Sequence, residues 1–294
     1  MSETSFVTAI LGLGLSLLPV LGCARSRSDA PAAPAGDLAL TIRSASGATT
    51  TVRVGLRAGY AGLRRPLDGL KAGEAGSGYL LAHARDRAHG VDLSTTTVAT
   101  DVALLDAAGR VLKVAPGVAA GARTRVDRIP DLYRSALVLP AGSAARLGLA
   151  PDAQVSFTLP EGAASEATLA PVTLRPPGRP EVTVAAELAV DDEEITLGLM
   201  YRRELPPLGG MLFRFETARV LGFWMENTRV PLDMIFLDED RRVTGVVQDA
   251  RPYDRTVVGV GRIPNRYVLE VRAGFARQHG IVAGTAAVFA IPKD

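Results

Sequence analysis

Residues 210–246 read GMLFRFETARVLGFWMENTRVPLDMIFLDEDRRVTGV, and residues 78–114 read GYLLAHARDRAHGVDLSTTTVATDVALLDAAGRVLKV. At an offset of 132 the two stretches share 12 identical residues in 37 positions. The identities include Thr96 with Thr228 and Asp101 with Asp233. Self-similarity at one fixed offset is the signature of a duplicated structural unit. The chain is therefore predicted to contain two copies of one domain.

The same register extends well beyond these stretches. It aligns residues 41–43 with 173–175, and it matches Gly148 with Gly280 and Phe157 with Phe289. We expect one domain over residues 38–158 and a second over 169–292, joined by a linker of small and polar residues at 159–168. Each copy then has about 120 residues, an ordinary size for a domain.

Short apolar runs separated by turn residues dominate both copies. Residues 51–54, 234–237, 267–269 and 287–289 are typical of strands. Turn chemistry falls at matching places, in residues 44–47 and 176–178 and again in 106–109 and 238–240. The predicted class is mainly β, with two tandem β-sandwich or barrel-like domains that carry one or two short helices each.

Two helices are expected in the second copy. One begins in the acidic run at 191–194, which is favourable at a helix N-terminus, and continues to Arg203. The other runs from Ala273 to His279 and ends at Gly280.

Composition excludes some classes of function. The chain has 294 residues with 33 basic and 31 acidic side chains, so its charge is nearly balanced. A protein that grips a nucleic-acid backbone normally carries an excess of basic residues. No nucleic-acid partner and no cofactor are expected.

The N-terminal residues predict export. Residues 6–22 form an apolar run of signal-peptide length, and the chain's single cysteine, Cys23, follows it. Residues 20–23 resemble a bacterial lipobox, in which the cysteine is lipidated and becomes the mature N-terminus. The segment 1–23 is then a lipoprotein-type signal, residues 24–37 a disordered tether, and the protein is anchored to a membrane of the cell envelope. The resemblance implies the periplasmic face of the outer membrane in a Gram-negative cell; an ordinary signal peptide or an uncleaved anchor is the alternative.

Several motifs of the second copy occur in order at regular spacing: residues 198–202 (GLMYR), 210–213 (GMLF), 223–228 (FWMENT), 231–236 (PLDMIF) and 267–270 (YVLE). Together they resemble the DUF192 family, a small β domain without an assigned activity. The resemblance covers about residues 169–292. The first copy resembles the family only through the second, because Asp92 stands opposite Trp224 and Ser94 stands opposite Glu226.

The segment from Trp224 to Asp233 is the best candidate site, because it gathers an aromatic ring, an amide, a hydroxyl and a carboxylate beside a buried strand. In a functional interpretation Trp224 and Met225 form a pocket wall, Asn227 and Thr228 orient a ligand, and Asp233 accepts a hydrogen bond or proton. In a structural interpretation the polar side chains tie loops together and Trp224 fills the core.

Two further charged residues of the second copy each allow two roles. Arg202 either binds a carboxylate ligand or pairs internally with Asp233 or Glu270. Glu270 lies within an apolar strand, where it either faces solvent or is a buried partner.

The sequence offers few candidate catalytic residues. The histidines His83, His89 and His279 belong to no shared arrangement, and no nucleophile motif or metal-ligand spacing is present. The preferred function is a non-catalytic module that binds a small polar ligand or an envelope partner through the Trp224–Asp233 region. The alternatives are a hydrolase that uses the Glu226 and Asp233 carboxylates on an envelope substrate, and a purely structural spacer.

Overall fold

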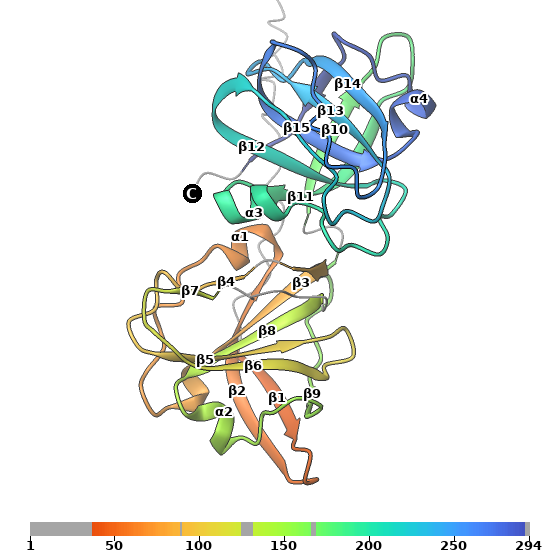
Figure 1. The fold of residues 1–294 in the computed structure, drawn as a ribbon. Helices are drawn as coiled ribbons and strands as arrows, with labels where there is room; N and C mark the ends of the chain where they lie inside the picture. Colours follow the sequence, from red (N-terminus) through yellow and green to blue (C-terminus); the bar gives the residue numbers. More distant parts are fainter. Residues whose placement is uncertain (1–36, 89, 125–131, 166–168, 292–294) are drawn as a thin grey trace, which may run out of the picture.

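A computed structural model describes residues 37–88, 90–124, 132–165 and 169–291, which form two β domains in series (Figure 1). The predicted signal segment 1–23, its lipidation residue Cys23, and the tether up to residue 36 lie outside the described residues, as does His89. Within the described ranges, no helix is long and apolar enough to cross a membrane.

The first domain is built on one curled seven-stranded sheet. Its order is β6-β5-β8-β3-β2-β1-β9, and a two-stranded β4-β7 ribbon lies beside it. The strands are β1 (Asp37–Arg43), β2 (Thr49–Ala58), β3 (Tyr79–Arg87), β4 (Val91–Asp92), β5 (Thr100–Leu105), β6 (Val111–Val118), β7 (Arg123–Thr124), β8 (Tyr133–Pro140) and β9 (Gln154–Ser156).

The second domain repeats this arrangement. Its sheet has the order β14-β13-β15-β12-β11-β10-β16. The strands are β10 (Ala170–Arg175), β11 (Val182–Ala189), β12 (Gly209–Val220), β13 (Leu232–Leu237), β14 (Val243–Ala250), β15 (Pro264–Arg272) and β16 (Ala286–Val288). The mainly β class with two tandem, barrel-like domains is confirmed.

The two sheets also share their pairing register. Tyr79 lies opposite Val138 in the first sheet, and Met211 lies opposite Glu270 in the second. The parallel pair β2–β3 begins with Gly55 opposite Tyr79, and the parallel pair β11–β12 includes Glu187 opposite Met211. Each residue of the second sheet is 132 positions after its counterpart, so the offset read from the sequence is also the geometric one.

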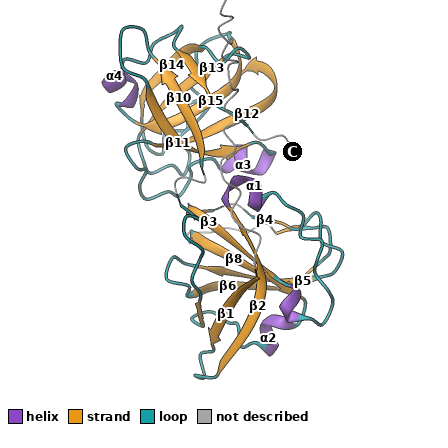
Figure 2. Cartoon of the chain, turned by 180° about the vertical axis from the view of Figure 1, so that it is seen from behind, coloured by secondary structure: helices purple, strands orange, loops and turns teal. Residues whose placement is uncertain are grey.

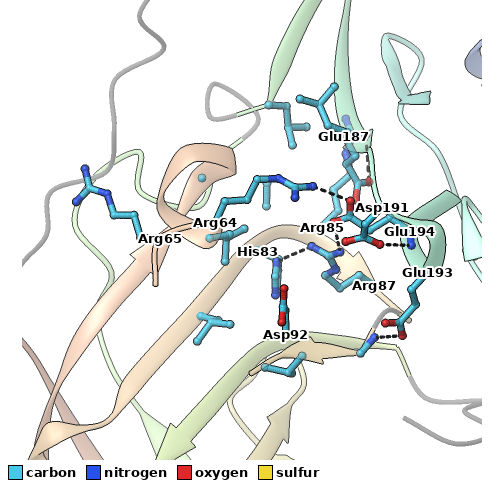
Figure 3. Close-up of a pocket in the computed structure, with 18 of the residues that line it drawn as sticks. Arg64, Arg65, His83, Arg85, Arg87, Asp92, Glu187, Asp191, Glu193 and Glu194 are labelled. Atoms are coloured by element: carbon cyan, nitrogen blue, oxygen red, sulfur yellow. Dashed lines mark hydrogen bonds and ion pairs between the residues drawn. The ribbon is translucent and has the colours of Figure 1, made fainter. Parts of the chain in front are cut away.

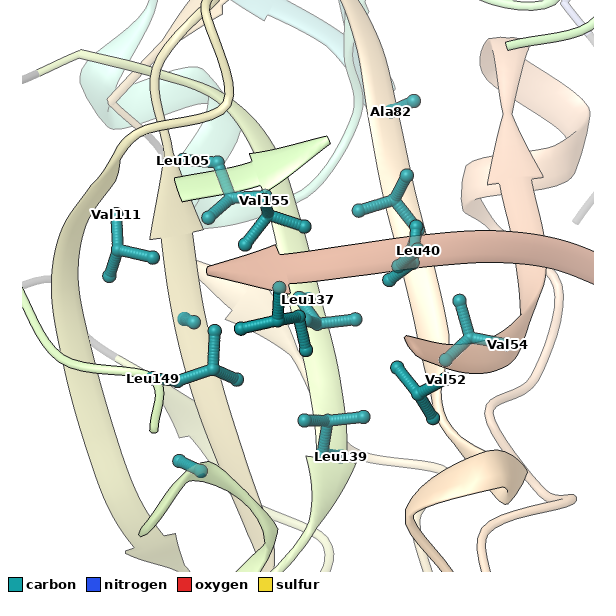
Figure 4. Close-up of a cluster of buried hydrophobic side chains, with 14 of the residues drawn as sticks. Leu40, Val52, Val54, Ala82, Leu105, Val111, Leu137, Leu139, Leu149 and Val155 are labelled. Carbon is teal, nitrogen blue, oxygen red and sulfur yellow. The ribbon is translucent and has the colours of Figure 1, made fainter. Parts of the chain in front are cut away.

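Both faces of each sheet are covered, which explains why the central strands are continuous apolar runs. In β13 all six residues are buried, and they alternate between two clusters. Ile235 and Leu237 pack with Val184, and Met234 and Phe236 pack on the other face with Phe213. The first domain has the same two-sided core, and Figure 4 shows the side that contains Leu40, Leu137 and Val155.

The helices are short and lie at the ends of the sheets (Figure 2). They are α1 (Gly59–Leu63), α2 (Ser143–Arg146), α3 (Asp192–Leu197) and α4 (Phe275–His279), with a 3₁₀ turn η1 (Ala75–Ser77). Helix α4 ends at Gly280 in the left-handed conformation, as expected.

Helix α3 is shorter than predicted. The Asp191 side chain accepts a hydrogen bond from the Glu194 N–H, which starts the helix in the predicted acidic run. The prediction that it continues to Arg203 is wrong, because Gly198 turns the chain with a φ of 45°. Tyr201 then takes a φ of 64°, which prevents the helix from resuming.

Candidate ligand site in the second domain

The second domain contains a cavity of about 460 Å³ between the end of α3 and one face of the sheet. Most of the side chains that line it are apolar or aromatic, and Trp224, Thr228, Arg219 and Glu270 add polar groups. The remaining lining residues are Ile195, Thr196, Leu197, Gly198, Leu199, Met200, Phe213, Phe215, Val220, Leu221, Gly222 and Phe223. A concave apolar space with a few polar groups has the composition of a small-molecule site.

Glu270 is the most unusual member of this lining. It lies on β15 between Met211 of β12 and Met234 of β13, and it is 4% exposed. Within the described part of the chain its carboxyl makes no hydrogen bond and no ion pair. Burial therefore raises the pKa of Glu270 to about 8, because the charged form has lost its water. An unpartnered carboxyl in an apolar core lowers stability, which is typical of a functional position rather than a structural one.

Aromatic rings form the wall of the cavity. The Phe223 ring meets Phe213, Phe215 and Phe236 edge to face, at centroid distances of 5.1, 6.3 and 5.9 Å. The backbone of Phe223 is fixed by two hydrogen bonds to Val258 at 2.9 and 2.8 Å. These contacts hold the wall rigid.

The conformation of Gly198 keeps space open beside Glu270. A Cβ atom at Gly198 would lie 3.0 Å from Cζ of Phe213 and 3.9 Å from Oε2 of Glu270. Its positive φ is also strained for any residue with a Cβ. The glycine that ends α3 therefore helps to form the cavity.

Two of the predicted site residues, Trp224 and Thr228, line this cavity. Trp224 is 46% exposed and lies at the rim of the cavity. The structural interpretation, in which Trp224 fills the core, is therefore wrong for this residue. Thr228 is buried, and its hydroxyl donates to the Glu226 carbonyl at 3.2 Å.

Met225 and Asn227 are not among the lining residues. Met225 is buried in the core cluster on the same face of the sheet. Asn227 adopts a left-handed backbone with a φ of 55°, and its carbonyl accepts a hydrogen bond from the Tyr201 N–H. Asn227 therefore connects two loops through its backbone.

Asp233 also lies outside the cavity. It is fully buried, and its two carboxylate oxygens accept hydrogen bonds from the Asp249 and Ala276 N–H groups at 2.9 and 2.8 Å. In the first domain Asp101 accepts from Gly117 and Ala144 at the same distances. Each N–H donor in the second domain lies 132 positions after its counterpart in the first domain. This hydrogen-bond network is therefore a structural element of the fold and not part of a ligand site.

Arg202 pairs internally with Glu187, and not with Asp233 or Glu270 as predicted. Its guanidinium is 5% exposed and lies 2.5 Å from the Glu187 carboxylate. Glu187 is on β11, one strand away from the cavity wall. Arg202 therefore stabilises the strand that faces the first domain.

The geometry does not assemble the predicted carboxylate pair. Glu226 pairs with Arg255 at 2.8 Å, and both oxygens of Asp233 are already occupied by backbone donors. The hydrolase alternative therefore loses one of its two carboxylates. In the described ranges there is also no group of three or more metal-binding side chains.

The second domain matches a known family. Residues 172–289 match the DUF192 family model, described as an uncharacterized ACR. The motifs of the second copy predicted this match, and the domain that contains it is named the DUF192 domain for its similarity to the model. A crystal structure of a "putative transcription regulator" from Sinorhizobium meliloti 1021 is 35% identical, over 41% of this chain and 92% of that one, with a TM-score of 0.40. A protein of unknown function from Novosphingobium aromaticivorans DSM 12444 is 37% identical, over 40% of this chain and 83% of that one, with a TM-score of 0.39. No curated protein matches the chain.

We call the cavity of the second domain the DUF192 cavity. The first domain has a cavity at the corresponding position. It measures about 290 Å³ and lies at the junction between the domains (Figure 3). Its lining includes Leu63, Arg64, Arg65, Leu67, Leu81, His83, Arg87, Gly90, Val91 and Asp92, each 132 positions before a residue that lines the DUF192 cavity. The two cavities are therefore equivalent places in the fold, with different chemistry.

Acidic residues of the DUF192 domain reach into this first cavity. Glu194 lies 2.6 Å from the Arg64 guanidinium and 3.5 Å from that of Arg87, and Figure 3 shows Arg64 pointing toward it. The Glu193 carboxylate accepts a hydrogen bond from the Gly90 N–H at 2.9 Å. The concave site of the first domain thus holds an acidic segment of its neighbour.

A second contact extends the same junction. Arg85 lies 3.7 Å from the Glu187 carboxylate, and it also donates to the carbonyls of Ala185 and Gly210. The absence of a side chain at Gly209 allows Arg85 to approach this closely, because a Cβ there would lie 2.8 Å from the Arg85 guanidinium. Sequence reasoning missed these residues, since no local pattern relates Arg64 or Arg85 to acidic residues more than a hundred positions later.

Proposed function

We propose that the DUF192 domain is a non-catalytic binding module that holds a small ligand in the cavity between α3 and β15. The observation that carries this proposal is Glu270, a buried carboxyl without a partner among the described residues, in the lining of an aromatic cavity. We therefore assign the ligand site to Trp224, Thr228 and Glu270, in place of the whole Trp224–Asp233 segment.

The first domain supports this use of the cavity. We propose that it is a degenerate DUF192 copy, in which Val138 replaces the buried glutamate and His83 and Leu81 replace two aromatic rings. Its cavity holds the Glu193 and Glu194 side chains of the neighbouring domain. The cavity of the first domain thus binds side chains of the neighbouring domain. We infer that the equivalent cavity of the DUF192 domain binds a ligand that is not part of this chain.

Chemical-shift mapping tests the binding proposal directly. The ¹⁵N-labelled full chain is titrated with a library of small polar aromatic and aliphatic fragments, and Glu270→Val serves as the matched variant. Hits are expected to shift the Gly198, Met200, Thr228 and Trp224 indole resonances of the wild type. Hits that map only to other surfaces, or a library without any saturable hit at millimolar concentration, would contradict a ligand site here.

The envelope location is a separate proposal that rests on the N-terminal sequence. We propose that Cys23 is lipidated and that the protein is tethered to a membrane of the cell envelope, with the periplasmic face of the outer membrane as the location in a Gram-negative cell. Labelled palmitate fed to cells expressing the full chain is expected to be incorporated into the wild type and not into Cys23→Ser. A wild-type chain that stays unlabelled and fractionates away from membranes would contradict the anchor.

A further inference from the structure

We propose that the DUF192 cavity recognises an organic amine, with its ammonium group at Glu270 and its apolar body against the rings of Phe213, Phe215 and Phe223. This inference rests on the binding function proposed above and specifies the chemistry of its ligand. It predicts that a carboxylate of similar shape binds more weakly than the amine.

The carboxyl supplies the first half of this chemistry. Glu270 is at a position of β15 whose neighbour two residues away, Val268, belongs to the apolar core cluster. An ammonium group bound beside the Glu270 carboxylate would form a desolvated ion pair with charge-assisted hydrogen bonds. Binding of the ammonium group would give the buried Glu270 carboxylate a charged partner.

The aromatic wall supplies the second half. The faces of aromatic rings attract cations, and the attraction grows as water is excluded. One ring of this wall already shows the preference, because the guanidinium of Arg219 lies over Phe215 at 4.9 Å from the ring centroid. A cationic ligand deeper in the cavity would use the same property of its neighbours.

The charged residues of the two equivalent cavities differ. In the first domain Arg64 and Arg87 face the incoming carboxylate of Glu194. In the DUF192 domain Thr196 stands at the position of Arg64, and Arg219 keeps the position of Arg87. Glu270 has been added to the lining. One cationic side chain is thus lost and one carboxyl is gained, and this change favours a basic group in the DUF192 cavity.

Few other groups can compete with Glu270 for the ligand. Among the described residues that line the cavity, Arg219 is the only other charged side chain, and it stacks at the wall rather than on the carboxyl. The segment 195–200 and the strand β13 present no charged side chain to the cavity, and Glu226 is paired with Arg255. The affinity for a cation is therefore controlled by the ionisation of Glu270.

Three probes of similar shape and different charge test the inference. The full chain is titrated calorimetrically with 2-phenylethylamine, 2-phenylethanol and 3-phenylpropionate, and Trp224 fluorescence serves as a second readout. We expect the amine to bind at least about tenfold more tightly than the alcohol at pH 8.5, and its affinity to fall toward pH 6 as Glu270 is protonated. At pH 7, titrations in two buffers of different ionisation enthalpy are expected to show release of about one proton per bound amine.

Glu270→Gln and Glu226→Gln are the matched variants. Glu270→Gln should abolish the preference for the amine and the proton release, and Glu226→Gln should retain both. If the alcohol or the carboxylate binds as tightly as the amine, the cation inference is overturned while the binding function stands. If none of the three probes binds, the inference is also overturned, and the fragment mapping then decides separately whether the cavity binds any ligand.

Discussion

Glu270 and Val138 occupy the same position of two equivalent sheets. Glu270 lies opposite Met211 and Met234, and Val138 lies opposite Tyr79 and Val102. Val138 is fully buried in the first domain's core. The fold of the first domain therefore accommodates an apolar residue at this position, and we infer that the carboxyl of the DUF192 domain serves the proposed ligand site.

The stability of the DUF192 domain should depend on the ionisation of Glu270. Its pKa is raised from 4.5 to about 8 by burial, so the folded state binds the proton more tightly than the unfolded state. The contribution of Glu270 to stability is then highest below about pH 4.5 and falls as the pH rises toward 8, by on the order of 4 kcal/mol for a shift of this size. Urea unfolding followed through Trp224, the only tryptophan, measures this directly.

Two substitutions control that experiment. Glu270→Gln should remove most of the decline between pH 5 and pH 8, because it cannot ionise. Glu226→Gln should leave the decline in place, because Glu226 is half-buried and already paired with Arg255. Equal pH profiles for the wild type and Glu270→Gln would show that the carboxyl is not perturbed.

Asp233 and Asp101 should have the same structural role in their own domains. Asp233→Asn leaves one of two buried backbone N–H groups facing an amide NH₂, which typically costs about 2 kcal/mol. We expect this loss in the transition reported by Trp224. Asp101→Asn should produce a similar loss in the first domain, visible by circular dichroism and not by Trp224. A stable Asp233→Asn variant would argue that the carboxylate is retained for another reason.

The junction should depend on the charges that meet in the first cavity. The double variant Arg64→Gln with Arg87→Gln removes both cationic partners of Glu194 without changing the DUF192 domain. We expect the two domains to separate, with a larger radius of gyration in small-angle scattering. Arg110→Gln is the control, because Arg110 pairs within the first domain and is largely exposed. An unchanged radius in the double variant would contradict this dependence and would show that the remaining contacts, such as those of Arg85, are enough to hold the junction.

Neighbouring aromatic residues should differ in their effect on stability. Trp224 is 46% exposed at the cavity rim, so Trp224→Ala is expected to cost less than about 1 kcal/mol. Phe223 packs against three phenylalanine rings, and Phe223→Ala is expected to cost about 3 kcal/mol. Guanidinium unfolding followed by circular dichroism compares the two. A loss as large for Trp224 as for Phe223 would contradict its placement at the rim.

Local patterns predicted the elements that depend on local chemistry. The hairpin turns and the start of α3 follow from residues close in sequence, and the two-domain organisation follows from comparing the chain with itself at an offset of 132. The length of α3 was predicted wrongly because Gly198 ends the helix at Leu197, six residues before the predicted end at Arg203.

The candidate site depends on contacts that sequence does not encode locally. Strand alternation allowed Glu270 to face solvent or the core, and only the packing of a second face over β15 decides between them. The junction joins Arg64 to Glu194, which are 130 positions apart. Neither residue stands out in its own segment, so only the assembled domains show that they meet.

The most direct test compares the unfolding free energies of the wild type and Glu270→Val at pH 8, with the full chain and Trp224 as the reporter. The substitution places in the DUF192 domain the residue that the first domain already carries as Val138. If the carboxyl is kept for a ligand and not for the fold, Glu270→Val should be more stable by at least about 2 kcal/mol, because a buried ionisable group without a partner is removed. A variant that is equally stable or less stable would show that Glu270 supports the fold, and the claim of a ligand site built around it would fail.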